Sequence, residues 1–318
     1  MMKKKIIAGI MALTIMVSLA GCTNKEYEAA VAAITAYNSE VDVYNGKVET
    51  YNSVIDTIEK ENASLTDAVK DAQAVIDSGA IPYDESTLSN LKDALASATD
   101  SEIEIPEKLP AEEKMEEVSD DLKKEELGII AAKAGLKLDD LKAISIPDTP
   151  SVPDYDDIIN NLETAVSEFN DSVSVMEQIS APSDDVVMKK LEKVETIEKM
   201  GAVTEDHDPN GKLGKQGGYI GCIFFRDSQV DQGKLSISGD REDPIDVGTQ
   251  GGGAIEIFGN VDEAEARNAY LANFDGTILE SGSHYVFGTM VIRTSAELTA
   301  SQQTELTDKI KEAFLSVD

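Results

Sequence analysis

The sequence is poor in cysteine and in positive charge. Only two of its 318 residues are cysteines, and 28 lysines and arginines stand against 61 aspartates and glutamates, which gives a formal net charge of −33. Such an acidic surface repels phosphate backbones and anionic lipid headgroups. We therefore expect no nucleic-acid partner and no folded part that lies flat on a bilayer.

The sequence also lacks an N-terminal apolar run long enough to span a membrane. The uncharged residues 6–19 follow Lys3, Lys4 and Lys5, and they are fewer than the roughly 20 apolar residues that a spanning helix needs. A basic segment, a short apolar run and small residues after it form the pattern of a signal peptide. We expect residues 1–21 to be a signal peptide rather than a transmembrane helix.

The apolar run ends in Leu19-Ala20-Gly21-Cys22. This segment resembles the lipobox of bacterial lipoproteins at all four positions. The resemblance implies a diacylglyceryl thioether on Cys22, cleavage before it, residues 22–25 as a short linker, and a lipid-anchored chain on the extracellular face of the cell membrane. The alternative is a plain signal peptide that happens to end in cysteine. With Cys22 acylated, Cys222 is the only free thiol, so no internal disulfide is expected.

Residues 26–202 are expected to form a helical bundle or spacer. Tyr-Asn pairs recur every seven residues, the coiled-coil period, and the register predicts one long helix over residues 26–77. The two seam positions hold Ile34, Val41, Val48, Ile55, Asn62, Val69 and Ile76, and Ala30, Tyr37, Tyr44, Tyr51, Ile58, Leu65 and Ala72. A similar pattern after Tyr155 suggests that later helices pack on this seam within the chain. A parallel dimer through the first helix is the alternative.

Prolines and glycines predict where further helices begin and end. We expect a short helix over residues 86–98, a linker marked by Pro106 and Pro110, a helix over 111–134 that breaks at Gly135, and helices after Tyr155 and Pro182. Residues 83–98 also resemble, over a short stretch, the small helical modules found in repeats of large Gram-positive surface proteins.

Residues 203–318 are expected to form a small α+β domain of order β-β-α-β-α. Strands are predicted at 219–226, 254–258 and 285–293, with helices at 262–274 and after a capping box of Thr299 and Gln302. This stretch resembles a domain of exported proteins and lipoproteins of Gram-positive gut bacteria, often labelled extracellular-matrix-binding-like. The resemblance is carried by HDPNG at 207–211, KQGGY at 215–219, EARNAYLANFDG at 265–276, SGSHYVFGT at 281–289 and ELTASQQ at 297–303. It implies location and architecture, and no catalytic residues.

Asp206, Asp208 and Asn210 reproduce the first half of an EF-hand calcium loop. Position twelve of that loop should be a bidentate glutamate, and here it is Gly217. Asp-Pro-Asn-Gly also fits a type I turn, with proline at its second position. We expect the turn, with a calcium site completed by distant acids as the alternative.

Other chemical motifs have structural explanations. Cys222 and His284 are the only pair that could form a thiol nucleophile and its base, but Cys222 is expected in the middle of a buried strand. The glycines at 248 and 251–253 precede a strand rather than a helix, and no Gly-Lys-Ser/Thr follows them. Arg267 could be a surface residue or a buried salt-bridge partner. No catalytic residue and no cofactor are expected.

These features predict a non-enzymatic surface lipoprotein whose helical spacer presents an α+β binding domain. The expected partners are the membrane, through the lipid, and a protein or a cell-wall or matrix polymer. The alternative is a sensor or solute-binding lipoprotein that holds a small ligand or Ca²⁺ near Asp208 and the glycine-rich loops. A hydrolase is a third possibility.

Overall fold

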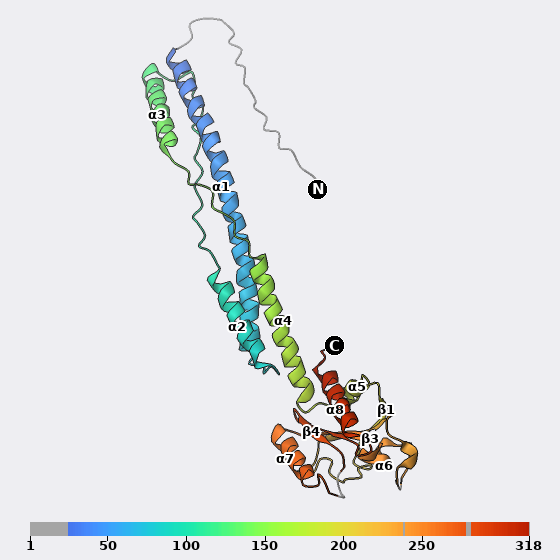
Figure 1. Cartoon of the computed structure of the whole chain (residues 1–318). Coiled ribbons are helices and arrows are strands. Elements are labelled where there is room, and N and C mark those ends of the chain that lie inside the picture. Colours follow the sequence, from blue (N-terminus) through green and yellow to red (C-terminus); the bar gives the residue numbers. More distant parts are fainter. Residues whose placement is uncertain (1–24, 238, 278–280, 318) are drawn as a thin grey trace. The chain divides into compact units, whose positions relative to one another are not determined.

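The computed structural model describes residues 25–237, 239–277 and 281–317, and it confirms the α and α+β class (Figure 1). Cys22 and the expected signal peptide, residues 1–21, lie outside the described residues. In the described part, no helix is both long and apolar enough to cross a bilayer. The chain divides into two compact units, the first from Met1–Glu61 and Ile103–Pro153, the second from Asn62–Glu102 and Asp154–Asp318.

Helices come first along the chain, and strands follow. The helices are α1 (Lys25–Asp77), α2 (Glu85–Asp100), α3 (Lys124–Ala143), α4 (Asp156–Ile179), α5 (Asp184–Leu191), α6 (Pro244–Val247), α7 (Val261–Ala272) and α8 (Ala300–Leu315). Short 3₁₀ turns occupy Gln232–Lys234 and Gly248–Gly251. The strands are β1 (Ile197–Ala202), β2 (Gly221–Asp227), β3 (Gly252–Ile257), β4 (His284–Phe287) and β5 (Met290–Thr294).

Helix α1 has the length that the seven-residue repeat predicted, and its seam is buried within the chain. Tyr37 is 2% exposed and Val41 and Ile55 are fully buried. The polar seam residue Asn62 is buried too, and its side-chain oxygen accepts a hydrogen bond of 2.9 Å from the Tyr155 hydroxyl. The seam therefore packs against later parts of the same chain.

In unit 1, an extended segment covers part of this seam, where the sequence predicted a helix. Residues 103–123, here called the strap, contain no helix or strand, and α3 begins only at Lys124 and continues through Gly135. The partly buried strap residues recur every third position, which is the period of a polyproline II helix. Over residues 106–118 these are Pro106, Leu109, Glu112, Met115 and Val118, and Leu122, four residues further on, is also partly buried. The predicted helix over 111–134 is therefore confirmed only for residues 124–134, and the prediction is wrong for 111–123 and for the break at Gly135.

Three asparagines of α1 hold the strap by its main chain. They are seven residues apart, whereas their partners are three residues apart. Each side-chain amide both donates to and accepts from one strap residue, in the pairs Asn38 with Met115, Asn45 with Glu112, and Asn52 with Leu109. The six hydrogen bonds are 2.8–2.9 Å long. We call these three paired contacts the asparagine ladder.

The strap is rich in helix-forming residues, but two pairs of like charges would weaken a helix there. Glu112 and Glu116, and likewise Glu113 and Glu117, would be four residues apart on one helix face, where like charges repel. The ladder instead supplies the main-chain hydrogen bonds that a helix would have made. Tertiary contacts thus override local propensity here.

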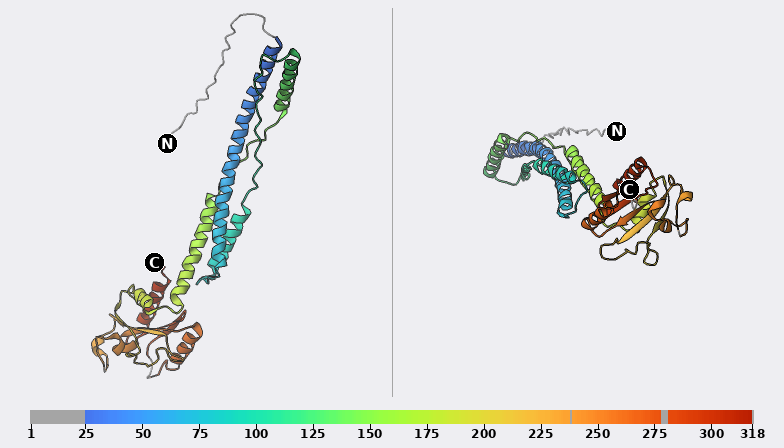
Figure 2. Two further views of the ribbon diagram at one scale, coloured as in Figure 1. Left: turned by 180° about the vertical axis from the view of Figure 1, so that it is seen from behind. Right: turned by 60° about the horizontal axis from the view of Figure 1, so that its bottom comes forward.

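In unit 2, α2 and α4 pack on the last part of α1 (Figure 2). Leu65, Leu91, Leu162 and Phe169 are buried in their common core. Asp84 caps α2 by accepting a hydrogen bond from the Ser86 amide, and its own amide donates to the Ser172 hydroxyl at 2.8 Å. Both helices are therefore fixed to each other as well as to α1.

The sheet of unit 2 is antiparallel, in the order β1-β2-β3-β5-β4. It has two strands more than the sequence predicted. Residues 197–202, assigned above to the helical region, form the edge strand β1, and residues 285–293 form the hairpin β4–β5 rather than one strand. The hairpin turns at Gly288, where φ is +60°, a value that glycine adopts without strain. The Thr299–Gln302 capping box of α8 is confirmed.

The two faces of the sheet are covered by different helices (Figure 1). Along β3, Ile255 and Ile257 pack with α5 and α8, whereas Ala254 and the following Phe258 pack with α7. Strand residues alternate between faces, so Glu256 belongs to the α7 face. Because Val187 and Leu191 of α5 are buried in the α8-side core, packing onto the sheet starts well before residue 203.

Helix α4 is joined to the sheet through the β4–β5 turn. The Thr289 amide donates to the Ile179 carbonyl at 2.9 Å, and the Ala181 amide donates to the Thr289 hydroxyl at 2.6 Å. A Cβ atom on Gly288 would lie 2.2 Å from the Ile179 carbonyl oxygen. Both the turn geometry and this close approach require glycine.

Candidate functional site

The candidate site lies on the α7 face of the sheet and is built around a buried carboxylate. Glu256, in the central strand β3, has a fully buried side chain. Arg267 of α7 binds it through Nε–Oε2 (2.6 Å) and Nη2–Oε1 (2.8 Å), and Arg293 of β5 binds it through Nη1–Oε1 (2.8 Å). Burial alone would raise the pKa of Glu256, but the two guanidinium groups outweigh it and lower that pKa.

The second wall of the site is the turn of residues 208–219. The Gly211 amide donates to the Asp208 carbonyl at 3.1 Å, which closes the turn predicted from Asp-Pro-Asn-Gly. The side chain of Asp208 accepts four further hydrogen bonds. Its donors are the amides of Asn210, Lys212 and Leu213 and the hydroxyl of Tyr219.

Asp208 is therefore an anion used to build the turn. Burial acts to raise its pKa, but the hydrogen bonds from Tyr219 and the three amides lower it to about 2. Asp206 is exposed, and the side-chain amide of Asn210 donates to the Tyr219 hydroxyl at 3.4 Å. The calcium alternative at Asp206, Asp208 and Asn210 would require breaking the hydrogen bonds that hold this turn.

Between this turn and α7 lies a cavity of about 430 Å³, a size typical of small-molecule sites. We call it the α7 pocket. The side chains that define its character are Lys212, Tyr219, Phe258, Glu263, Arg267 and Tyr270. Gly218 also borders it, and a Cβ atom there would lie 2.0 Å from the Lys212 carbonyl oxygen. Glycine at this position lets the turn fold tightly enough to leave the cavity open.

Arg267 connects the buried ion pairs to the pocket. Among the described residues its hydrogen bonds go only to Glu256, through Nε and Nη2, so Nη1 remains for a ligand. Its guanidinium carbon lies 5.5 Å from the ring centre of Tyr270, within cation–π range. The structure thus decides between the two predicted roles of Arg267, and it is a salt-bridge partner.

Two buried groups at the site, Tyr219 and Cys222, have a pKa raised further from neutral pH. Burial and the hydrogen bond to Asp208 raise the pKa of Tyr219, and burial raises the pKa of the Cys222 thiol. Both groups therefore stay protonated, while Asp208 stays ionised. A general acid or base needs a pKa near the working pH, so this arrangement suits binding better than proton transfer.

The structure places Cys222 and His284 in separate surroundings. Cys222 is fully buried in β2, opposite Glu256 in the register. His284 uses both ring nitrogens, with Nδ1 2.6 Å from the Asn268 oxygen and Nε2 3.2 Å from an Asp275 oxygen. Neither ring nitrogen is left to activate a thiol.

The glycine-rich stretch has a packing role. Gly248–Gly251 forms a 3₁₀ turn, and Gly252 and Gly253 begin the buried strand β3. A Cβ atom on Gly253 would lie 2.2 Å from the Arg293 carbonyl oxygen and 2.4 Å from the Phe225 ring. The glycines therefore allow close contact between neighbouring strands. This agrees with the expectation that the glycine-rich stretch has a structural role rather than a phosphate-binding one.

The structure also brings together His207, Asp243 and Asp246, a combination that the sequence did not indicate. One potential ligand atom from each lies within 4.8 Å of the other two. Nε2 of His207 is 2.8 Å from Asp246, and both carboxylates also accept main-chain hydrogen bonds, from the amides of Ile245 and Asp240. These contacts account for the cluster as an ion pair that ties two loops together.

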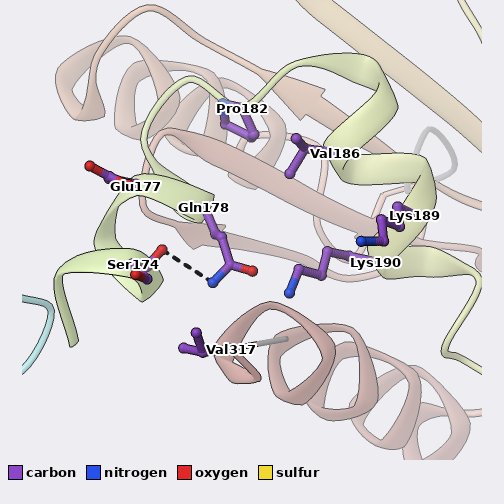
Figure 3. A pocket seen from close by; sticks show the side chains of 8 residues that line it. All are labelled: Ser174, Glu177, Gln178, Pro182, Val186, Lys189, Lys190 and Val317. Atoms are coloured by element: carbon purple, nitrogen blue, oxygen red, sulfur yellow. Dashed lines mark hydrogen bonds between the residues drawn. The ribbon is translucent and has the colours of Figure 1, made fainter. Parts of the chain in front are cut away.

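A second cavity, of about 390 Å³, lies between the end of α4, α5 and the C-terminal residues (Figure 3). Gln178 and Lys190 extend into it from opposite sides. The Lys190 amine donates to the Ser316 carbonyl at 2.7 Å, so this lysine fastens the end of the chain. The Lys190 amine of this cavity is thus used to hold residues 316 and 317 against α5.

Sequence reasoning missed Glu256 and Arg293 as parts of the site. A signal was present, because each is the one charged residue within an otherwise apolar strand, AIEIF and MVIR. Buried charges of this kind usually pair with each other. Only the β3–β5 register, with Ala254 opposite Arg293, shows that they meet.

Comparison of the chain with protein-family models, curated proteins and solved structures gave no match. The site must therefore be interpreted from its own geometry.

Proposed function

We propose that this chain is a non-enzymatic, lipid-anchored protein of the cell surface that binds its target through the α7 pocket. The observation that carries the proposal is the pocket itself, because its walls are fixed by the Glu256 ion pairs and by the Asp208 turn. A pre-formed cavity with rigid polar groups is the usual form of a ligand site. Its size fits one residue-sized group of a wall or matrix polymer.

The helical region supports a role as a spacer. Helix α1 contains 53 residues, which at 1.5 Å each corresponds to about 80 Å of helix, and it begins shortly after the proposed anchor at Cys22. In unit 2 the hydrogen bonds between Ile179 and Thr289 attach α4 to the binding domain. A helix attached in this way can hold the domain at a distance from the membrane.

Binding is tested by thermal-shift screening of the full chain, in mild detergent, against sugars, peptides and divalent metals. We expect stabilisation by one class of compound, and loss of that stabilisation in Tyr270→Ala. Tyr270 is 55% exposed, so its removal should leave the fold intact. Tyr285, also exposed, is packed beneath Lys311 of α8 on the other side of the sheet, and Tyr285→Ala is the matched control.

Anchoring is tested by fractionating cells that express the chain or its Cys22→Ser variant. The variant should leave the membrane fraction, because it lacks the sulfur that carries the lipid. If it stays with the membrane as fully as the parent does, the lipoprotein proposal is wrong.

A sensor or solute-binding role is the second candidate. The volume of the pocket supports it as well as it supports the surface-binding role, because a free small molecule would fit the pocket as well as one group of a polymer would. The two roles differ in the size of the ligand. A free small molecule that binds as tightly as a polymer containing the same group would support the sensor, whereas clearly tighter binding of the polymer would support the surface-binding role.

A further inference from the structure

Two cations line the α7 pocket of this strongly acidic protein. Lys212 and Arg267 line it together with one acid, Glu263, one of whose oxygens already accepts a hydrogen bond from the Gly259 amide at 3.1 Å. Next to the pocket, two arginines share the single carboxylate of Glu256. The carboxylates of Glu256 and Asp208 adjoin the pocket, but both already accept several hydrogen bonds from the protein. The lining itself therefore has one more cation than it has acids, in a chain of formal charge −33.

Arg267 has donors that the described residues do not use. Its Nε and Nη2 bind Glu256 and occupy one edge of the guanidinium. Nη1 of Arg267 is uncommitted among the described residues, and Arg267 lines the cavity. A planar guanidinium with a free edge matches the geometry of a carboxylate.

The remaining walls are aromatic. Tyr219 and Phe258 are almost fully buried, whereas Tyr270 is exposed and lies over the guanidinium of Arg267. A flat ring can pack on such faces, and the cavity of about 430 Å³ is of the size that holds one small molecule.

We propose that the α7 pocket binds a carboxylate attached to a six-membered ring, with the carboxylate on Arg267 and Lys212 and the ring against Tyr270 and Phe258. This inference rests on the proposed binding function and specifies its ligand class. Two sources share this chemistry, namely the acidic sugars of surface polysaccharides and small aromatic acids.

The test compares acids with their neutral counterparts by titration calorimetry on the full chain in mild detergent. The probes are glucuronate against glucose, and benzoate against benzamide. We expect at least one acid to bind about tenfold or more tightly than its neutral counterpart, the scale of one charge-assisted hydrogen bond. The pair that shows the difference identifies the source of the ligand.

Variants that keep the buried ion pairs intact then locate the binding site. Lys212→Gln should weaken the acid and leave the neutral compound unchanged, and Tyr270→Ala should weaken both. Lys309→Gln, an exposed lysine on α8 paired with Glu305, and Tyr285→Ala are the matched controls and should have no effect. Arg267 itself is left unchanged, because its removal would leave Glu256 with a broken buried ion pair.

The outcomes separate this inference from the proposed function. Equal binding of acids and neutral compounds, weakened by Tyr270→Ala, would overturn the ligand class and keep the pocket as a binding site. Binding that none of the pocket variants changes would overturn both. Absence of binding by all four probes at millimolar concentration would overturn the ligand class, and the broader thermal-shift screen would then decide the proposed function.

Discussion

Glu256 determines the chemistry of the α7 face through a single carboxylate. Taking a charge out of water costs several kcal/mol, and only close partners offset that cost. Arg267 approaches with two hydrogen bonds from α7, and Arg293 adds a third from the neighbouring strand. The same contacts that satisfy Glu256 fix the position of α7 on the sheet, and so they also fix one wall of the pocket.

His207 is the residue whose charge should respond to pH. Its hydrogen bond to Asp246 raises its pKa, desolvation acts against this, and the charges of Asp246 and Asp243 add to the increase. Since the folded pKa is raised, the stability contributed by this ion pair is complete below the unfolded pKa of about 6.5. It is lost as the pH rises through the higher folded pKa.

We expect Asp246→Asn to lower the pKa of His207, because the variant removes the main partner of the imidazolium. The measurement is an NMR titration of the imidazole signals, with those of His284 as internal reference. Asp262→Asn, an exposed acid in the first turn of α7, serves as control. An unchanged His207 titration in Asp246→Asn would contradict the assigned ion pair.

Among the elements, the strap depends on hydrogen bonds rather than on charge. Both the strap and the facing part of α1 are acidic, and Lys108 and Lys114 form ion pairs from the strap to α1, with Asp56, Glu59 and Asp42. Such exposed ion pairs contribute little. The uncharged contacts must therefore supply much of the attachment, and these include the asparagine ladder, the hydrogen bond from the Tyr37 hydroxyl to the Glu113 carbonyl, and the packing of Leu109 and Met115 against the seam.

We predict that Asn45→Ala loosens the middle of the strap. The change removes two hydrogen bonds of 2.9 and 2.8 Å and leaves the Glu112 main chain without these partners, a loss of about 1–3 kcal/mol in local stability. Hydrogen exchange at the Glu112 amide should become faster. Asn161→Ala, at an exposed asparagine of α4, should leave this exchange rate unchanged. Equal protection in both variants would mean that the ladder does not hold the strap.

Elements governed by local signals were predictable from the sequence. The heptads indicated α1, and the Thr299–Gln302 capping box indicated the start of α8. The strap was not predictable, because its individual residues are good helix formers, whereas it is held extended by contacts with distant residues of α1, among them the three asparagines. The β4–β5 hairpin was predicted as one strand because its turn residues, Gly288 and Thr289, interrupt an apolar run without proline or asparagine.

The site was less accessible to sequence reasoning than the elements. The turn at Asp208 was predictable, since Asp-Pro-Asn-Gly carries its own signal. The pocket combines this turn with α7 and with Phe258, which follows β3, and no local pattern indicates that these segments meet. Strand register alone brings Arg293 to Glu256.

At the scale of the whole molecule, the joint between α4 and the sheet determines how firmly α4 is attached to the α+β domain within unit 2. Gly288 has a φ of +60° and lies against Ile179, whereas Gly276 has a φ of +69° and a Cβ atom on it would point into open space. Substitution therefore strains the backbone at both glycines, and only at Gly288 does it add a steric clash.

We expect Gly288→Ala to lower the melting temperature clearly more than Gly276→Ala does. The control variant should lose about 1–2 kcal/mol from the left-handed backbone alone, and the clash with Ile179 adds to this in Gly288→Ala. Thermal unfolding followed by circular dichroism measures the difference. Limited proteolysis near Ala181 should also become faster in Gly288→Ala only. Equal losses in the two variants would show that the joint tolerates the methyl group.

The geometry of the asparagine ladder limits how many asparagine–strap pairs can form. Seven helical residues advance by about 10.5 Å and three polyproline-like residues by about 9.3 Å. The mismatch between α1 and the strap therefore grows by about 1.2 Å from each asparagine to the next. If the middle asparagine is aligned with its strap partner, each outer asparagine is displaced along the helix axis from its own partner by about 1.2 Å, which small side-chain adjustments can absorb. A further asparagine at either end would be displaced by about 2.4 Å, which is more than a hydrogen bond tolerates. The positions where further rungs would fall hold Val31 and Glu59, and the series stops at three.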